Sequence, residues 1–445
     1  MASDLLAIAR SGTKAARAAL DVTAQNIANA SSDGFVRRSV SLSEVSAAGG
    51  VGRTGDISLS GVRIDGVTRN ADLFRQAEVR RTGADAARAD AEVNGLENVE
   101  AAVEQAGVYD ATVDFEGSLK QLVSDPTDGS LRAAVIESSR ALASSFKVAS
   151  TSLDAAGKGL RFQAQDDVDQ VNLLAGELAR VNSRLSRATE ASSDQSTLLD
   201  QRDNLLQQLG TRIDTTATFA PDKTVEVRIG GSGGPVLLSG QATSPLAMTM
   251  ASDGTIGFTL GGGAVTASSG ALAGRGQALT QLAATRGKVD AVAASVIAAV
   301  NTAQANGVDL NGTAGQPLLS GTGAGDIALA QTDGAKIATA PAGSSANSRD
   351  TGNIAALRTA IDTADPAGKL DAVLFDISSA VAGRTVTRDA LDGIASNAKV
   401  ALQAQAGVDL DQEAVNLVRY QQAFQASGRV MQVASSLFDT LLNIR

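Results

Sequence analysis

Length, composition and charge exclude several classes of protein. The chain has 445 residues and a formal net charge of −10, and it contains no cysteine, histidine or tryptophan. Without cysteine there are no disulfides or thiolate nucleophiles, and without histidine the commonest general base and the commonest metal ligand are missing. The negative charge argues against a surface that binds nucleic acid or an anionic membrane.

A helix is predicted for residues 3–30, because apolar and small residues recur there every seven positions. One row contains Leu6, Thr13, Leu20 and Ile27, and its companion contains Ala9, Ala16, Thr23 and Ala30. The small residues of the second row allow another helix to approach closely. The apolar run from Leu5 to Ala9 is too short for the core of a cleaved signal peptide, so none is expected.

Residues 36–70 are predicted to form a connector with short strands. Alternating residues mark candidate strands at 40–42, 57–59 and 62–64, and glycines lie between them. A flexible linker is the alternative interpretation of this stretch.

Two stretches, residues 71–212 and 271–404, are predicted to form one bundle of long helices. In the first stretch, Asp128 or Ser130 is expected to cap a helix and Gly210 to end one. A coiled-coil seam is predicted from residues at alternating spacings of three and four, namely Val171, Leu174, Leu178, Val181 and Leu185. Residues 307–348 are rich in glycine, alanine, serine and threonine, which favours a loop with short strands.

A small β domain is predicted at residues 213–270. Val225, Val227 and Ile229 alternate with polar residues, and Asp253-Gly254 is typical of a tight hairpin turn. A domain of this size has a marginal core, so we expect it to depend on its neighbours. The fold class is therefore mainly α and multidomain, with a β insertion.

No motif in the sequence carries chemistry. The glycine-rich stretch 230–234 lacks the Lys-Ser/Thr of a phosphate-binding loop, so a hairpin turn is predicted. Asp166, Asp167 and Asp169 lie on a helical stretch without glycine turns, which favours a solvated helix face over a cation site. We predict no catalytic residue, no metal site and no cofactor.

The last segment, residues 408–445, is predicted to be a single long helix with a coiled-coil seam. One row of this seam contains Leu410, Leu417, Phe424, Met431 and Phe438. A second row contains Tyr420, Ala434 and Leu441, and Glu413 and Ser427 interrupt it. Asp409 or Asp411 can cap the start of the helix.

The two terminal helices are expected to pair with each other. A lone amphipathic helix of this length cannot bury its apolar stripe, so residues 1–35 and 405–445 are predicted to form one coiled-coil domain. Its apolar residues are the candidate assembly interface: Leu6, Leu20, Ile27, Leu410, Leu417, Tyr420, Phe424, Met431, Phe438 and Leu441.

Both ends of the chain resemble a known family. The stretches 26–30 and 33–38, Asn-Ile-Ala-Asn-Ala and Asp-Gly-Phe-Val-Arg-Arg, resemble the N-terminal signature of bacterial flagellar axial proteins. The stretches 407–413, 420–424 and 438–445 resemble the matching C-terminal signature. Rod, hook and hook-associated proteins share these ends. The stretches 114–116 and 198–203 further resemble the members that join the hook to the filament.

The resemblance implies a structural subunit at the distal end of the hook, which assembles as a helical array through its terminal helices. Its partners would be further copies, the hook protein, a second hook-associated junction protein, an export chaperone and the type III export apparatus. It would act outside the cell in the flagellum and would be secreted without a cleaved signal peptide. No nucleic-acid partner and no insertion into a membrane are expected. Residues 307–348 are shorter than in relatives, which implies that an additional domain is missing.

Two alternatives remain open from the sequence. The chain resembles other axial proteins as well, so a hook, rod or second junction protein is possible, although the helical stretch 71–211 argues against a hook or rod protein, whose middle is mainly β. From a different class, a peptidoglycan hydrolase could be carried on an axial scaffold. Such an enzyme would need a cleft with paired carboxylates, and no pair is singled out by the sequence.

Overall fold

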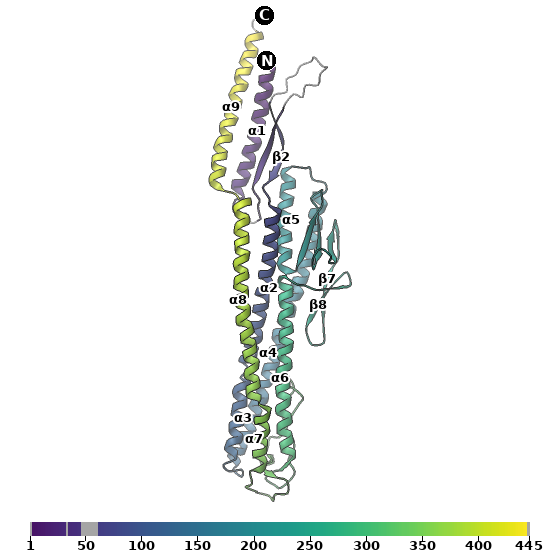
Figure 1. The fold of residues 1–445 in the computed structure, drawn as a ribbon, viewed down its shortest axis with the longest axis vertical. Helices are drawn as coiled ribbons and strands as arrows, with labels where there is room; N and C mark the ends of the chain where they lie inside the picture. Colours follow the sequence, from purple (N-terminus) through teal and green to yellow (C-terminus); the bar gives the residue numbers. More distant parts are fainter. Residues whose placement is uncertain (1, 33, 46–60, 443–445) are drawn as a thin grey trace. The chain divides into compact units, whose positions relative to one another are not determined.

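Long helices dominate the structure, with small antiparallel sheets beside them (Figure 1). The computed structural model describes residues 2–32, 34–45 and 61–442. The prediction of a mainly α, multidomain chain with β insertions is confirmed. The chain packs as two compact units: unit 1 draws on residues 1–84, 170–245 and 392–445, and unit 2 on residues 85–169 and 246–391. The division into four domains with the predicted boundaries stays a prediction.

The terminal part of unit 1 is a helix pair with a two-stranded sheet. Helices α1 (Ala2–Ala28) and α9 (Leu410–Leu442) lie side by side and antiparallel (Figure 1). Strands β1 (Arg38–Glu44) and β2 (Val62–Arg69) pair antiparallel, with an irregularity between Ser41 and Leu42. The predicted strand at 57–59 lies outside the described residues.

The start of α9 is set by one carboxylate. Helix α8 (Pro366–Ala406) ends just before Gly407, so the predicted last helix is preceded by a break. The Asp409 carboxylate then accepts hydrogen bonds from the amides of Asp411 and Gln412, at 3.0 and 3.2 Å. Of the two predicted caps, Asp409 is therefore the one used.

Unit 1 also contains parts of α2 (Leu73–Glu104) and α4 (Gly129–Leu185), together with α5 (Ser193–Arg212). Val181, Leu185 and Leu198 form a buried cluster, as the predicted seam requires. The prediction that Gly210 ends a helix is wrong, since α5 continues to Arg212. A Cβ at position 210 would lie 3.7 Å from the backbone oxygen of Arg80, an ordinary van der Waals distance, so packing against α2 does not require a glycine there.

A four-stranded antiparallel sheet belongs to unit 1. Its order is β3 (Thr215–Phe219), β4 (Val225–Ile229), β5 (Val236–Ser239) and β6 (Ala242–Thr243). The alternating apolar residues of β4 are all buried. Asn182 of α4 joins the sheet to the helices, since its amide donates to the carbonyls of Val225 and Gly240 at 2.8 and 2.9 Å. Its side-chain oxygen accepts from the Val225 amide at 2.9 Å.

The region predicted as one β domain holds two separate sheets. The first belongs to unit 1 and the second to unit 2. The second sheet consists of β7 (Leu246–Met250), β8 (Ile256–Leu260) and β9 (Gly263–Val265), and the predicted hairpin turn at Asp253-Gly254 joins the first two. Four very short strands follow between residues 307 and 341: β10 (Gly307–Val308), β11 (Leu319–Ser320), β12 (Ala328–Leu329) and β13 (Ala340–Pro341). The predicted loop with short strands is confirmed.

The core of unit 2 is formed by helices. Helices α3 (Val108–Leu122), α6 (Gly270–Ala305) and α7 (Gly352–Ala364) pack with parts of α2, α4 and α8 around one apolar cluster. The Asp128 carboxylate accepts from the amides of Ser130 and Leu131 at 2.7 and 2.9 Å, so Asp128 is the α4 cap and Ser130 is not. Arg132 is almost fully buried and donates to the carbonyls of Pro126, Gly334 and Ile337, at 2.6, 3.0 and 2.9 Å.

One acidic residue differs from its predicted environment. Asp166 and Asp169 are exposed on α4, as expected, but Asp167 is buried and forms an ion pair with Arg275 of α6. The prediction of a solvated face is therefore wrong for Asp167. Its position between the buried Ala164 and Val168 turns it towards the core of unit 2, and a guanidinium on a neighbouring helix compensates its charge.

Candidate assembly interface

Small residues bring α1 and α9 close together. Ala9 and Ala16 of α1 are 3% and 6% exposed, and Ala434 of α9 is 2% exposed. A Cβ built on Gly12 would lie 2.9 Å from the hydroxyl oxygen of Ser427, which is closer than real Cβ contacts come. The small row predicted on α1 is therefore the row that faces α9, and it allows the close approach expected from its size.

On α9 the row that faces α1 is not the one with the large apolar residues. The buried positions are Glu413, Asn416 and Ala434, and Tyr420 and Ser427 on the same side are half-buried. The row predicted as the principal seam lies beside them.

The two residues interpreted as interruptions of the second row are part of the contact. Glu413 is buried, and its carboxylate accepts from the guanidinium of Arg37 at 2.7 Å. Ser427 is small enough to lie against Gly12. Charge pairing and size, rather than hydrophobicity, place both residues in the interface, which a search for apolar periodicity cannot detect.

The predicted interface residues divide into two groups. Leu20, Ile27, Leu417, Tyr420 and Met431 are half-buried. Leu6, Leu410, Phe424 and Phe438 are exposed, at 44%, 53%, 39% and 53%. The side chain of Leu441 lies outside the described residues. The exposed group has no apolar partner within the described chain that covers it.

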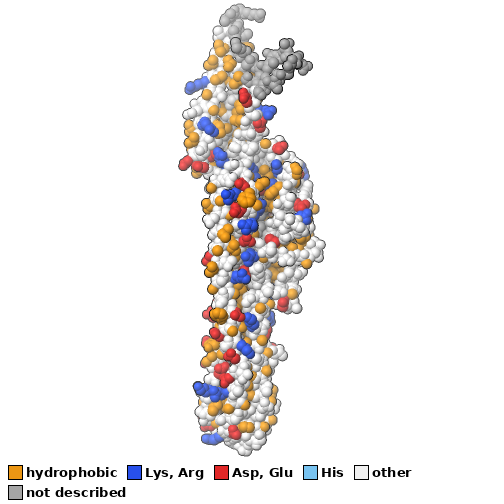
Figure 2. Space-filling view, viewed as in Figure 1, with side chains coloured by type: hydrophobic (Ala, Val, Ile, Leu, Met, Phe, Trp, Pro, Cys, Tyr) orange, Lys and Arg blue, Asp and Glu red, His pale blue; other side chains and the backbone are white. Residues whose placement is uncertain are grey.

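A second apolar stripe on α9 was missed by the sequence analysis. We define the outer stripe as Val415, Val418, Val433 and Leu437, which are 63%, 51%, 57% and 46% exposed. Val433 immediately precedes Ala434, so the outer stripe lies roughly 100° around the helix from the row that faces α1. Figure 2 shows hydrophobic side chains gathered on the surface of the terminal helices. The available signal was the spacing of three residues between Val415 and Val418 and of four residues between Val433 and Leu437.

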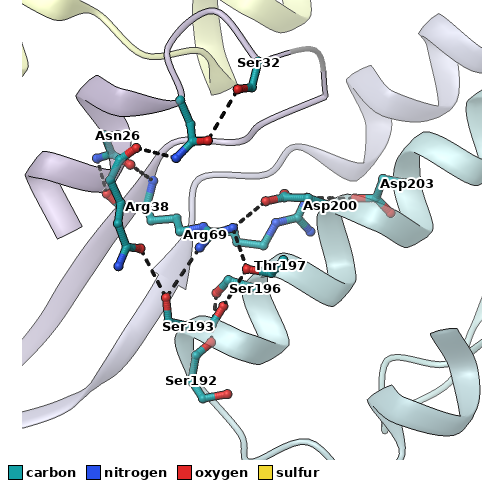
Figure 3. Close-up of polar contacts among 12 residues, drawn as sticks. Asn26, Ser32, Arg38, Arg69, Ser192, Ser193, Ser196, Thr197, Asp200 and Asp203 are labelled. Atoms are coloured by element: carbon teal, nitrogen blue, oxygen red, sulfur yellow. Dashed lines mark hydrogen bonds and ion pairs between the residues drawn. The ribbon is translucent and has the colours of Figure 1, made fainter. Parts of the chain in front are cut away.

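A buried polar network anchors the terminal part of unit 1 to α5 (Figure 3). The side chain of Asn26, in the last turns of α1, donates to the carbonyl of Arg38 at 2.9 Å and accepts from its amide at 3.0 Å. The Arg38 guanidinium then donates to the carboxylate of Asp200 at 2.7 Å and to the hydroxyl of Thr197 at 3.2 Å. The end of α1, the start of β1 and α5 are thereby held together.

The network continues through Arg69 at the end of β2. Its guanidinium lies 2.7 Å from the carboxylate of Asp200 and 3.0 Å from that of Asp203, and its side chain is 6% exposed. Arg202 also contacts the Asp203 carboxylate at 2.7 Å. Burial raises the pKa of Asp200, and the guanidinium groups of Arg69 and Arg38 oppose this effect. The stretch 198–203, noticed only as a family motif, is therefore the anchor of both connector strands.

The connector is also fixed to the break between α8 and α9. The Arg37 amide donates to the carbonyl of Ala406 at 2.9 Å, and the Asn70 amide donates to the carbonyl of Arg37 at 2.9 Å. The Asn70 side chain donates to the carbonyl of Gln405 at 2.9 Å. Together with the Arg37–Glu413 ion pair, these bonds determine where α9 begins against the end of α1.

Neither a metal centre nor a membrane span is found in the parts of the chain that the structure describes. No group of three or more acidic residues there is arranged to hold a metal ion. No helix among those residues is both long and apolar enough to cross a bilayer.

Known families match three parts of the chain. Residues 93–319 match the family described as the flagellar hook-associated protein FlgK helical domain. Residues 6–35 match the flagella basal body rod protein family, and residues 403–444 match the C-terminal family of the flagellar basal body rod FlgEFG proteins. The first match covers about half of the chain, and the other two cover the terminal helices.

Two curated relatives align over nearly the full length of this chain. The flagellar hook-associated protein 1 of Bacillus subtilis (strain 168) is 24% identical over 98% of this chain and 97% of its own. The protein of the same name from Escherichia coli (strain K12) is 25% identical over 100% of both chains. The solved structure of the flagellar hook junction protein FlgK from Burkholderia pseudomallei has a similar fold, with a TM-score of 0.50 and 22% identity over 54% of this chain and 46% of that one. The chain belongs to the family of the flagellar hook-associated protein FlgK.

Proposed function

We propose that this chain joins the distal end of the flagellar hook to the filament, and that its terminal helices make the contacts between subunits. The observation that carries this proposal is the set of exposed apolar residues on α1 and α9, in segments that match flagellar axial families. The α1–α9 contact uses small residues, so the large apolar side chains remain available for neighbouring copies.

The outer stripe can provide a substantial part of the assembly energy. Complete burial of a valine or leucine side chain contributes about 1.5–3 kcal/mol relative to full exposure. The four residues of the outer stripe are roughly half exposed, so their burial contributes on the order of 3–6 kcal/mol per subunit. A contact of this kind between different surfaces of identical chains produces an open helical array when the rotation between neighbours does not close into a ring.

The remaining functional assignments rest on the family. The partners would be the hook protein and a second hook-associated junction protein, with an export chaperone and the type III export apparatus acting before assembly. The protein would be located outside the cell in the flagellum and would not be an enzyme. The alignment with the Escherichia coli relative extends over 558 positions, against 445 residues in this chain, which supports the inference that a domain is missing.

Complementation tests this function. The gene is deleted in the source bacterium, and the strain is complemented with the wild-type chain or with a variant carrying Val433→Asp and Leu437→Asp. We expect wild type to restore filaments in negative-stain images, and the variant to leave bare hooks. Circular dichroism should show that the variant keeps its helices, because both positions are exposed in the single chain.

The control carries Val148→Asp and Phe162→Asp, which are also exposed, at 48% and 77%, but lie on α4 in unit 2. It should support filaments. If filaments form with the Val433 and Leu437 variant, the terminal helices do not make the contacts proposed. If filaments form without the gene, the junction function itself is wrong.

A further inference from the structure

A basic groove lies between α1 and β2. We define it by the residues that line a depression of about 640 Å³: Leu6, Ala7, Arg10, Ser11, Lys14, Val62, Arg63 and Ile64. Its apolar floor is accessible, since Leu6 and Ile64 are 44% and 39% exposed. It combines apolar contact with positive charge along one side of the terminal helix pair.

The positive charge of the basic groove is largely uncompensated. Arg10 and Lys14 are exposed, and neither forms an ion pair within the described parts of the chain. Arg63 pairs with Asp65 on the same strand at 2.9 Å, with an Arg63 side chain that is 72% exposed. The positive charges of Arg10 and Lys14 therefore remain available for an acidic partner.

The matching surface is the first part of α9, which we call the acidic tip. Asp411 is exposed there and has no ion-pair partner among the described residues, and Asp409 adds a second carboxylate. Val415 and Val418 follow on the outer side of the helix and, with Ala414, Arg419 and Gln422, line a shallow groove of about 480 Å³. The acidic tip thus offers an apolar patch next to negative charge.

The two surfaces cannot meet within one chain. Gly12, beside the basic groove, lies against Ser427 of α9. Asp411 is sixteen residues earlier in that helix, which places it about 24 Å away along the helix axis. A second copy displaced by this distance along the axis would bring its acidic tip to the basic groove.

We propose that the basic groove binds the acidic tip of a second copy of this chain. The contact is heterologous, so each subunit uses its groove for one neighbour and its tip for another, and the pairing repeats along the array. Charge complementarity sets the axial displacement, while Leu6, Val415 and Val418 lose their exposure. This inference rests on the proposed junction function and specifies one contact within it.

Cysteine crosslinking tests the contact directly, because the natural chain contains no cysteine. Flagella are isolated from the deletion strain complemented with a chain carrying Lys14→Cys and Asp411→Cys, oxidised, and analysed on a non-reducing gel. We expect a ladder of covalent dimers, trimers and larger species, since the bonds form between chains. The control chain carries Lys14→Cys and Asp439→Cys, with Asp439 at the other end of α9, and should remain monomeric.

The outcomes separate the two proposals. A chain that is present in the flagella but gives only monomers, or a control that gives an equal ladder, overturns the groove contact and leaves the junction function intact. Absence of the wild-type chain from isolated flagella overturns the junction function and the inference with it.

A charge exchange provides an independent measurement. Lys14→Asp and Asp411→Lys should each lower the amount of chain retained in flagella about fivefold, the effect of an exposed ion pair worth about 1 kcal/mol. The double variant should recover most of this loss, and Arg17→Asp, on the same helix outside the groove, should change little. A double variant no better than the worse single variant contradicts the pairing.

Discussion

Replacement of Arg69 by methionine tests whether the buried network fixes the connector to α5. Methionine keeps an unbranched apolar chain but removes the guanidinium. The Asp200 and Asp203 carboxylates, 13% and 9% exposed, then each lose one partner at 2.7 and 3.0 Å. Arg38 and Arg202 remain as their other partners.

The expected loss of stability is about 3 kcal/mol. Removal of one partner from a buried ion pair costs about 3–5 kcal/mol, and the lower end applies because each carboxylate keeps a second guanidinium. The loss should depend on pH. Burial already raises the pKa of Asp200, and the variant lacks the Arg69 charge that opposes this. A raised pKa of Asp200 in the folded state means that protonation of this carboxylate favours folding. The stability deficit of the variant is therefore smallest near the ordinary aspartate pKa of 3.8, and it grows as pH rises through the raised pKa.

Urea unfolding followed by circular dichroism at several pH values measures this deficit. The matched control is Arg63→Met, on the same strand, because Arg63 forms a comparable pair with Asp65 but is 72% exposed. The control should lose less than about 1 kcal/mol. Equal losses in both variants, or a deficit in Arg69→Met that does not change between pH 4 and pH 7, would refute the reasoning.

Three further substitutions test other contacts. Gly12→Val should destabilise the α1–α9 pair by about 1–3 kcal/mol, because the new side chain overlaps Ser427. The loss should appear as faster hydrogen exchange in α9. Gly428→Val is the control and should not have this effect, because no atom lies within 4 Å of a Cβ built there. Asn182→Ala should cost about 3 kcal/mol in urea unfolding and expose the β4 amides, since it leaves buried backbone groups without partners. Arg132→Met should lower the unfolding free energy of unit 2 by a similar amount, measured by calorimetry, because Arg132 holds residues 334–339. An unfolding transition that does not change in calorimetry would contradict this role.

The sequence by itself determined most of the helices and strands. The seven-residue recurrence predicted both terminal helices, and the alternation at Val225, Val227 and Ile229 predicted β4. Asp128 and Asp409 were identified as helix caps, each as one of two candidates. These features depend on local preferences, which act between residues close together in the chain. The terminal motifs also indicated the flagellar family before any fold was known.

Tertiary structure decided which residues meet. Periodicity placed the α9 seam on the row from Leu410 to Phe438, whereas packing against the small residues of α1 selected the row with Glu413 and Ser427. The Arg69–Asp200 pair joins residues more than a hundred positions apart, and Asp167 is buried because Arg275 of another helix compensates its charge. A buried charge is tolerated only when a partner is present, and no local pattern shows that partner. Helix and strand positions follow from neighbouring residues, but the contact faces depend on which distant surfaces fit.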